Sequence, residues 1–199
     1  RKFLHAGPGY GGSCFPKDCL ALVKTAQEAG APVSIVEAVI EVNDNRKEAM
    51  AQRVIHACGG NVQGKTLAIL GVTFKPNTDD MRDSPSLVVI PALQKAGAAI
   101  RAFDPEGMKE AAKIMHNVNF CANAYEAMEG ADAVVIVTEW NEFRALDLSR
   151  VMNLLRTPTV IDLRNIYKPE DMSAAGFYYV SVGRAPVDVR YASRQFQWR

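Results

Sequence analysis

From residue 65 onward, short apolar runs alternate with amphipathic segments, and this alternation limits the possible folds more than any other feature. Strand-length apolar runs occupy residues 65–72, 98–105, 118–122, 131–138, 159–164 and 178–183. Helical spacing of apolar side chains occupies residues 85–97, 106–115, 124–131 and 146–155. Strands that are apolar throughout need cover on both faces, which a parallel sheet between helical layers provides. The pattern predicts an α/β fold with a Rossmann-like doubly wound parallel sheet, and ligands at the carboxyl ends of its strands.

The first 60 residues have a different texture. Glycine and proline dominate HAGPGYGGSCF (5–15), which predicts a tight loop whose backbone can approach a ligand closely. A helix should run from Pro16 to Gly30, and a longer one from Pro32 to Gly59. Roughly 40 Å long at 1.5 Å per residue, this central helix could connect domains, pack against a second subunit, or form the core of one domain. We expect three parts: residues 1–60, the sheet domain 61–184, and a disordered or docked tail 185–199.

Composition argues against several classes of partner. The formal net charge is +1, so no bulk field attracts nucleic acid or an anionic membrane. The longest apolar runs have strand length, so no membrane span is expected. The four cysteines (Cys14, Cys19, Cys58 and Cys121) form no CxxC pair and do not cluster with the histidines, so no metal site is expected. Reduced thiols in the cytoplasm are the expected setting.

Cys14 lies just before a predicted helix start, where unpaired amides and the helix dipole favour a thiolate. A thiolate there, next to a loop of glycine backbone, suits covalent catalysis on a carbonyl. Asp18 follows one helical turn later and could share the site. The alternative is a small buried cysteine, with Asp18 stabilising the first turn of the helix. A thiol hydrolase would need a histidine partner, and only His5 lies near in the sequence.

Four sequence segments carry a family resemblance. GPGYGGSCFPKD (7–18) resembles the catalytic-cysteine segment of the UDP-glucose/GDP-mannose dehydrogenase family. GVTFKPNTDDMRDSPS (71–86) resembles the segment that opens the C-terminal domain of the family. TEWNEF (138–143) is similar to a motif typical of members that act on UDP-glucose, and VIDLRNIY (160–167) is similar to a late substrate-binding strand. The four segments occur in family order and extend the resemblance to about residue 184.

This resemblance implies a two-step oxidation in which the sugar C6 alcohol becomes an aldehyde and then an acid, consuming two NAD⁺ and one water. Cys14 would attack the aldehyde, and Asp18 would organise water and act as a general base together with an upstream lysine. Because the chain starts at Arg1, directly before the loop, we expect the NAD-binding domain and that lysine to lie upstream. A homodimer through the central helix is expected by analogy.

The resemblance also assigns binding residues. Those that would bind the nucleotide sugar are Phe3, Leu4, His5, Gly7, Gly9, Tyr10, Gly11, Phe74, Lys75 and Arg164. Those that would border NAD are Phe15, Lys17 and Arg82. Taken as residues alone, Lys75 and Arg82 could equally be ordinary surface charges, and Trp140 is interpreted as a packing residue.

The sheet domain departs from the dinucleotide-binding pattern. Its first strand is followed by Gly71 alone instead of GxGxxG, so a dinucleotide is not expected there, which agrees with a UDP-binding domain. Asp104 is interpreted as a turn residue at the end of the second strand. UDP-glucose is the expected substrate. GDP-mannose, a UDP-N-acetylhexosamine, or a non-catalytic role in nucleotide-sugar binding and dimerisation are the alternatives.

Overall fold

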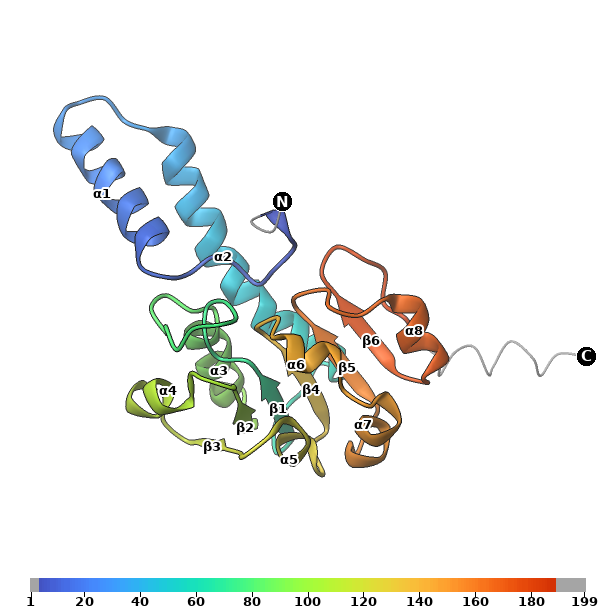
Figure 1. Cartoon of the computed structure of the whole chain (residues 1–199). Helices are drawn as coiled ribbons and strands as arrows, with labels where there is room; N and C mark the ends of the chain where they lie inside the picture. The colour runs from blue at the N-terminus through green and yellow to red at the C-terminus, as the bar shows by residue number, and fades with distance from the viewer. Residues whose placement is uncertain (1–3, 189–199) are drawn as a thin grey trace, which may run out of the picture.

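The structure, a computed structural model, describes residues 4–188 of the 199-residue chain. Two helices form a hairpin that projects from an α/β part (Figure 1). Helix α1 spans Cys14–Glu28, and α2 spans Ser34–Ala57, which is 24 residues or about 36 Å. The carboxyl-terminal half of α2 packs into the core of the α/β part through Met50, Ala51 and Val54. Helix α2 therefore connects the hairpin to the sheet.

One parallel sheet forms the centre of the α/β part. Its strands are β1 (Thr66–Leu70), β2 (Ala99–Phe103), β3 (Val118–Phe120), β4 (Ala133–Ile136), β5 (Thr159–Asp162) and β6 (Tyr178–Ser181). Their order across the sheet is β3-β2-β1-β4-β5-β6, and every neighbouring pair is parallel. The order reverses between β1 and β4, which is the switch point of a doubly wound fold. The predicted fold class is confirmed.

Two apolar layers cover the sheet, because successive side chains of a strand point to opposite faces. On β1, Leu67 and Ile69 join the core formed with α2 and α3. Ala68 and Leu70 join the second core, under α5, α7 and α8. The helices of the α/β part are α3 (Ser86–Lys95), α4 (Met108–Ile114), α5 (Ala124–Met128), α6 (Asn141–Arg144), α7 (Leu148–Leu154) and α8 (Pro169–Ala174).

Several boundaries differ from the predicted ranges. The first helix begins at Cys14, two residues before Pro16, so the cysteine is its first residue. Helix α4 begins at Met108 because the amides of residues 106 and 107 donate to Asp104 instead. Helices α6 and α8 were not predicted, since four and six residues are too few to show a helical period.

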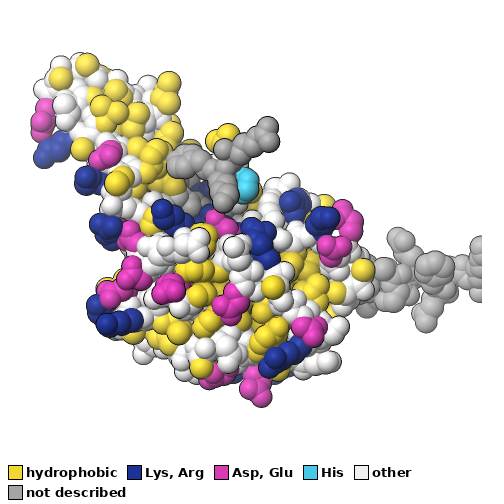
Figure 2. Space-filling view, in the orientation of Figure 1, with side chains coloured by type: hydrophobic (Ala, Val, Ile, Leu, Met, Phe, Trp, Pro, Cys, Tyr) yellow, Lys and Arg dark blue, Asp and Glu magenta, His cyan; other side chains and the backbone are white. Residues whose placement is uncertain are grey.

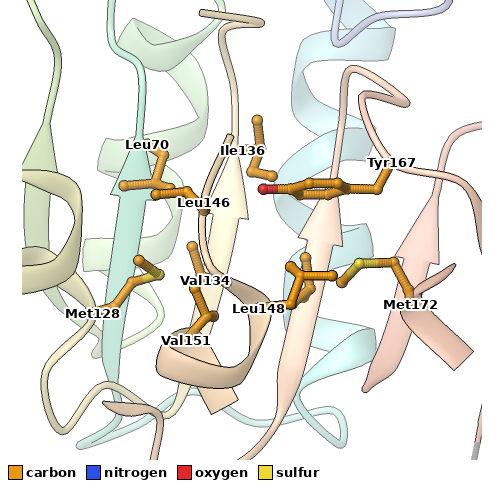
Figure 3. A pocket seen from close by; sticks show the side chains of 10 residues that line it. Leu70, Met128, Val134, Ile136, Leu146, Leu148, Val151, Tyr167 and Met172 are labelled. Carbon is orange, nitrogen blue, oxygen red and sulfur yellow. The ribbon is translucent and has the colours of Figure 1, made fainter. Parts of the chain in front are cut away.

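The second core encloses one small cavity of about 10 Å³ (Figure 3). Side chains from β1, β4, α5, α7 and α8 point into it, including Leu70, Val134 and Met172. The Tyr167 hydroxyl, also at this cavity, donates to the backbone carbonyl of Phe143. A space this small and apolar accepts one water at most, so it is a packing defect and not a ligand site.

The hairpin carries an exposed apolar face (Figure 2). Large apolar side chains on α1 and α2 are between 38% and 80% exposed, namely Leu20, Leu22, Ile35, Val39 and Val42. On α2 these exposed residues lie in the first half of the helix. Among the helices of this part of the chain, none has the length and hydropathy needed to cross a membrane.

Candidate active site

The glycine-rich loop, residues 5–13, lies between α2 and the carboxyl edge of the sheet. Its contacts are with segments that follow β1 and β5. The backbone amide of Gly12 donates to the carbonyl of Arg82 at 2.7 Å, which fixes the loop to the segment after β1. Gly9 and Gly12 have φ values of +126° and +87°, where only glycine is unstrained. The loop therefore has a defined conformation, which this hydrogen bond and the two positive-φ glycines fix.

Close approach explains two further glycines of the loop. A Cβ added at Gly7 would lie 2.7 Å from Nη1 of Arg164, and one at Gly11 would lie 2.3 Å from the carbonyl oxygen of Asp83. Both distances are far inside van der Waals contact. The glycines were predicted to let the backbone approach a ligand, and the structure shows them approaching the protein's own sheet edge. The cysteine that follows is placed by these contacts.

Helix α2 holds the other side of the loop. The Asn43 side chain accepts from the amide of Tyr10 (2.8 Å) and donates to its carbonyl (3.3 Å), while Arg46 Nε donates to the Gly7 carbonyl at 2.7 Å. Sequence reasoning missed Asn43 and Arg46 because it followed the apolar side chains of this helix. Polar residues three apart on a helix that elsewhere is apolar were the available signal.

Cys14 is exposed and begins α1, with its sulfur 3.7 Å from the Ser13 hydroxyl. The Ser13 side chain makes no hydrogen bond that caps the helix. Asp18 lies one turn later, is exposed, and forms an ion pair with Lys17 at 3.5 Å. Within residues 4–188 no hydrogen bond joins Cys14 to Asp18. The alternative of a buried, apolar Cys14 is wrong.

Among the predicted substrate-binding residues in the described range, Arg164 makes the most hydrogen bonds and ion pairs through its side chain. Its Nε donates to the Val137 carbonyl (2.8 Å) and its Nη2 to the Phe74 carbonyl (3.0 Å). Nε also lies 3.1 Å from a carboxylate oxygen of Glu139. Because the Nε hydrogen points at Val137, this second contact is an ion pair without a hydrogen bond. Burial lowers the pKa of Arg164, and Glu139 opposes that shift. Arg164 thus ties together the loops after β1, β4 and β5, with Nη1 against the loop at Gly7.

Phe74 and Lys75 border the loop on the sheet side. A Cβ at Gly12 would lie 2.8 Å from the Phe74 ring, so the ring packs directly on the loop. The exposed Lys75 places its Nζ 5.2 Å from the centre of the same ring, a cation–π geometry. The ring therefore holds the lysine charge close to the loop.

Arg82 is exposed but not an isolated surface charge. Its guanidinium makes two hydrogen bonds to the Asp80 carboxylate, at 2.9 and 2.8 Å. These hydrogen bonds lower the pKa of Asp80 and raise that of Arg82, and the nearby Cys14 adds to the latter shift. Arg82 also borders an open groove of about 500 Å³ that contains Asp79, Asp80 and Glu110. That acidic lining disfavours phosphate in the groove.

The remaining predicted residues lie around Cys14 or outside the described range. Tyr10 and Phe15 pack edge to face, with ring centres 4.4 Å apart, and partial burial raises the pKa of the Tyr10 hydroxyl. Leu4, His5 and Lys17 are exposed. Phe3 lies outside the described residues, as does most of the predicted tail, residues 189–199. In residues 4–188 no cluster of His, Cys, Asp or Glu side chains could hold a metal ion.

Asp104 does more than the turn role that was predicted for it. One carboxylate oxygen accepts from the amides of residues 106 and 107, as a turn residue would. The other accepts from the amides of Val72 and Thr73, the Thr73 hydroxyl and the Trp140 indole, and the residue is fully buried. The carboxylate therefore occupies the amides after β1 that would otherwise face a phosphate. Trp140 is a buried packing residue, as interpreted, and its indole donates this hydrogen bond to Asp104.

Comparisons with known proteins agree with this architecture. The family model for the UDP-glucose/GDP-mannose dehydrogenase family, UDP binding domain, matches residues 68–169, and the model for the central domain of that family matches residues 1–45. The UDP-glucose 6-dehydrogenase of Rhizobium meliloti (strain 1021) is 58% identical over 183 residues, covering 92% of this chain and 42% of the relative.

Two solved structures are similar over 89% of the chain. The UDP-glucose dehydrogenase of Pyrobaculum islandicum is 30% identical with a TM-score of 0.74, and 38% of that chain is covered. The NDP-N-acetyl-D-galactosaminuronic acid dehydrogenase of Methanosarcina mazei Go1 is 26% identical with a TM-score of 0.79, and 39% of that chain is covered. This chain spans about two fifths of the length of the relatives it matches. Motif order, sheet topology and both family models agree: the chain belongs to the UDP-glucose/GDP-mannose dehydrogenase family.

Proposed function

We propose that this chain is the catalytic-cysteine and nucleotide-sugar-binding part of an NAD-dependent UDP-glucose 6-dehydrogenase. One observation carries the proposal: an exposed cysteine begins α1 at the point where a glycine loop is fixed to the carboxyl edge of a parallel sheet. The name printed for the Rhizobium meliloti relative supports UDP-glucose as the substrate. In this proposal the loop residues 5–13, with Phe3, Leu4, Phe74, Lys75 and Arg164, bind the nucleotide sugar.

The cofactor would meet this chain beside Cys14. Arg82, Phe15 and Lys17 are exposed there, so they are available to hold the nicotinamide side of NAD. The amides after β1 are taken by Asp104, so NAD would not bind in the sheet domain itself. NAD supplies two-electron oxidation of the sugar carbon, once at the alcohol stage and once at the aldehyde stage.

Cys14 would retain the reactive intermediate between the two oxidations. Its thiolate adds to the C6 aldehyde carbon, forming a C–S bond, while the carbonyl oxygen takes up a proton to give a thiohemiacetal. Oxidation of this adduct leaves a thioester. Water, with Asp18 as the proposed base, adds to the thioester carbon, and the C–S bond breaks to release the carboxylate and return the thiolate. The whole reaction uses one water and two NAD⁺, and releases two NADH and three protons.

Reconstitution of the complete enzyme tests this proposal. The chain is joined to the part of the Rhizobium meliloti relative that it does not match, and NADH formation is followed with UDP-glucose, GDP-mannose and UDP-N-acetylhexosamines. We expect UDP-glucose to give the highest kcat/KM, and Cys14→Ala to abolish formation of the acid. Acid formation that is unchanged in Cys14→Ala would refute the nucleophile, and preference for another sugar would refute the substrate.

We further propose that a second copy covers the exposed apolar face of the hairpin, giving a homodimer through the central helix. Ile35 and Val42 are the most exposed apolar residues of α2, and burying such side chains stabilises association by roughly 1.5–3 kcal/mol each. Ile35→Glu should convert the dimer to a monomer in sedimentation experiments, and a monomeric wild-type chain would overturn the proposal.

Reduced thiols, with Cys14 required as thiolate, favour the cytoplasm as the place of action. Residues 1–60, 61–184 and 185–199 remain the proposed division of the chain.

A further inference from the structure

The face of α2 that meets the glycine loop carries three polar side chains, and one of them has no hydrogen-bond or ion-pair partner within residues 4–188. Asn43, Arg46 and Lys47 are spaced so that they share this face. Asn43 and Arg46 hydrogen-bond to the loop backbone. Lys47 is only 6% exposed, yet its ammonium makes no hydrogen bond or ion pair with the residues between 4 and 188. Lys47 is therefore a largely buried lysine whose ammonium has no partner among the described residues.

A lysine with a buried stem normally keeps its ammonium hydrated or paired with an acidic or carbonyl group, because removing its hydration without compensation costs several kcal/mol. Two half-buried cations of this chain have such partners: Arg164 lies against Glu139, and Lys65 donates to the Cys58 carbonyl. Two loop carbonyls on this side accept from the other polar residues of α2: Gly7 accepts from Arg46, and Tyr10 accepts from Asn43. Lys47 differs from these two, because its side chain is largely buried while its ammonium makes no hydrogen bond or ion pair within residues 4–188.

The Lys47 side chain lies directly under the loop. A Cβ at Gly9 would lie 3.0 Å from Lys47 Cγ, and Gly9 has a left-handed φ of +126°. The loop backbone therefore bends in a way that makes room for the lysine stem. The Lys75 charge also lies close to this loop, over the Phe74 ring that packs on Gly12. Lys47 and Lys75 have no ion-pair partner within residues 4–188, and two such positive charges favour an anion.

We propose that Lys47 is a positioning residue for the phosphates of the nucleotide sugar. Its charge, held next to the loop, compensates for a diphosphate that binds to the glycine backbone. This inference rests on the proposed function, because that function supplies the nucleotide diphosphate. Phosphoryl oxygens suit the site since backbone amides and a point-charge ammonium both recognise them.

Calorimetry on the 199-residue chain tests the inference with UDP, UMP and uridine as ligands. Lys47→Met keeps the unbranched apolar stem but removes the charge. We expect it to weaken UDP binding at least tenfold, UMP binding less, and uridine binding by less than twofold. Lys47→Arg should recover UDP affinity to within threefold. Lys95→Met is the matched control, because Lys95 is exposed in the last turn of α3, away from the loop, and should leave all three affinities unchanged.

The outcomes separate the two proposals. If the wild-type chain binds none of the three ligands, the nucleotide-sugar function fails and the role of Lys47 fails with it. If the wild type binds UDP and Lys47→Met binds it equally well, only the role of Lys47 is overturned. Equal weakening of UDP and uridine would also overturn it, since a purely structural lysine affects all ligands alike. Lys47→Gln, with circular dichroism to check folding, replaces the methionine variant if that variant unfolds.

Discussion

Gly11→Ala is the sharpest test of how the loop positions Cys14. Gly11 lacks the left-handed φ of its neighbours, so alanine is not excluded by its backbone conformation. The obstacle is steric: the new Cβ would lie 2.3 Å from the carbonyl oxygen and 2.8 Å from the carbonyl carbon of Asp83. Backbone atoms cannot rotate away as a side chain can. The loop itself must therefore move away from the segment after β1.

The size of the effect follows from that geometry. Restoring ordinary contact requires a displacement of about 1 Å, which would stretch the 2.7 Å hydrogen bond from Gly12 to Arg82. Overpacking of this kind costs about 1–3 kcal/mol of stability, or roughly 2–4 °C of melting temperature per kcal/mol in a chain of this size. A misplacement of about 1 Å at a reacting group lowers the rate by about 10²-fold.

The assay combines kcat/KM for UDP-glucose in the reconstituted enzyme with the melting temperature. Gly59→Ala is the control: Gly59 has φ +87° with nothing within 4 Å of an added Cβ, and it lies at the far end of α2. It should cost about 1 kcal/mol through its backbone conformation without changing kcat/KM. The positioning argument is refuted if Gly11→Ala retains kcat/KM within threefold of wild type.

Other substitutions and labels test separate parts of the structure. Asp104→Asn should destabilise the fold by about 3 kcal/mol or more, since an amide NH₂ would face at least two donors that the carboxylate now satisfies; urea denaturation measures this, and a loss under 1 kcal/mol contradicts it. Iodoacetamide should label the exposed Cys14 first and the buried Cys121 last, as followed by mass spectrometry; the reverse order would be incompatible with the site. Because Arg82 lowers the pKa of Asp80, its stabilisation is present above the ordinary value of 3.8 and is lost below it. The stability difference between wild type and Asp80→Asn should therefore shrink as the pH falls below 3.8, and a difference that grows would show the sign to be wrong.

The sheet was predictable from the sequence because its signal is local. Each buried strand is a short apolar run, and the run 131–138 contains β4 (Ala133–Ile136). The short helices were not predictable from periodicity, although α8 has Pro169 in its first turn followed by two acids. That pattern is a start signal which the alternation alone does not use.

The candidate site was predicted in its residues but not in its contacts. Family motifs place Cys14, Arg82 and Arg164 in one site, and the structure brings their segments to the same loop. The partners of these residues come from far along the chain, as when Arg46 reaches Gly7 or Arg164 reaches Phe74. Such pairings depend on how the strands are ordered in the sheet, which no local pattern specifies.

Because α2 is long, a small rotation about its end in the core displaces the rest of the helix by a larger distance. Val54 packs in the core under the sheet, and Asn43 hydrogen-bonds to the glycine loop. At 1.5 Å per residue, Asn43 lies about 16 Å nearer the hairpin tip than Val54. A tilt of about 7° around the locked end would carry the gripped backbone about 2 Å sideways, and the sulfur that follows would move relative to Arg164. A partner that binds the tip of the hairpin would therefore change the distance between the Cys14 sulfur and the substrate without contacting either of them.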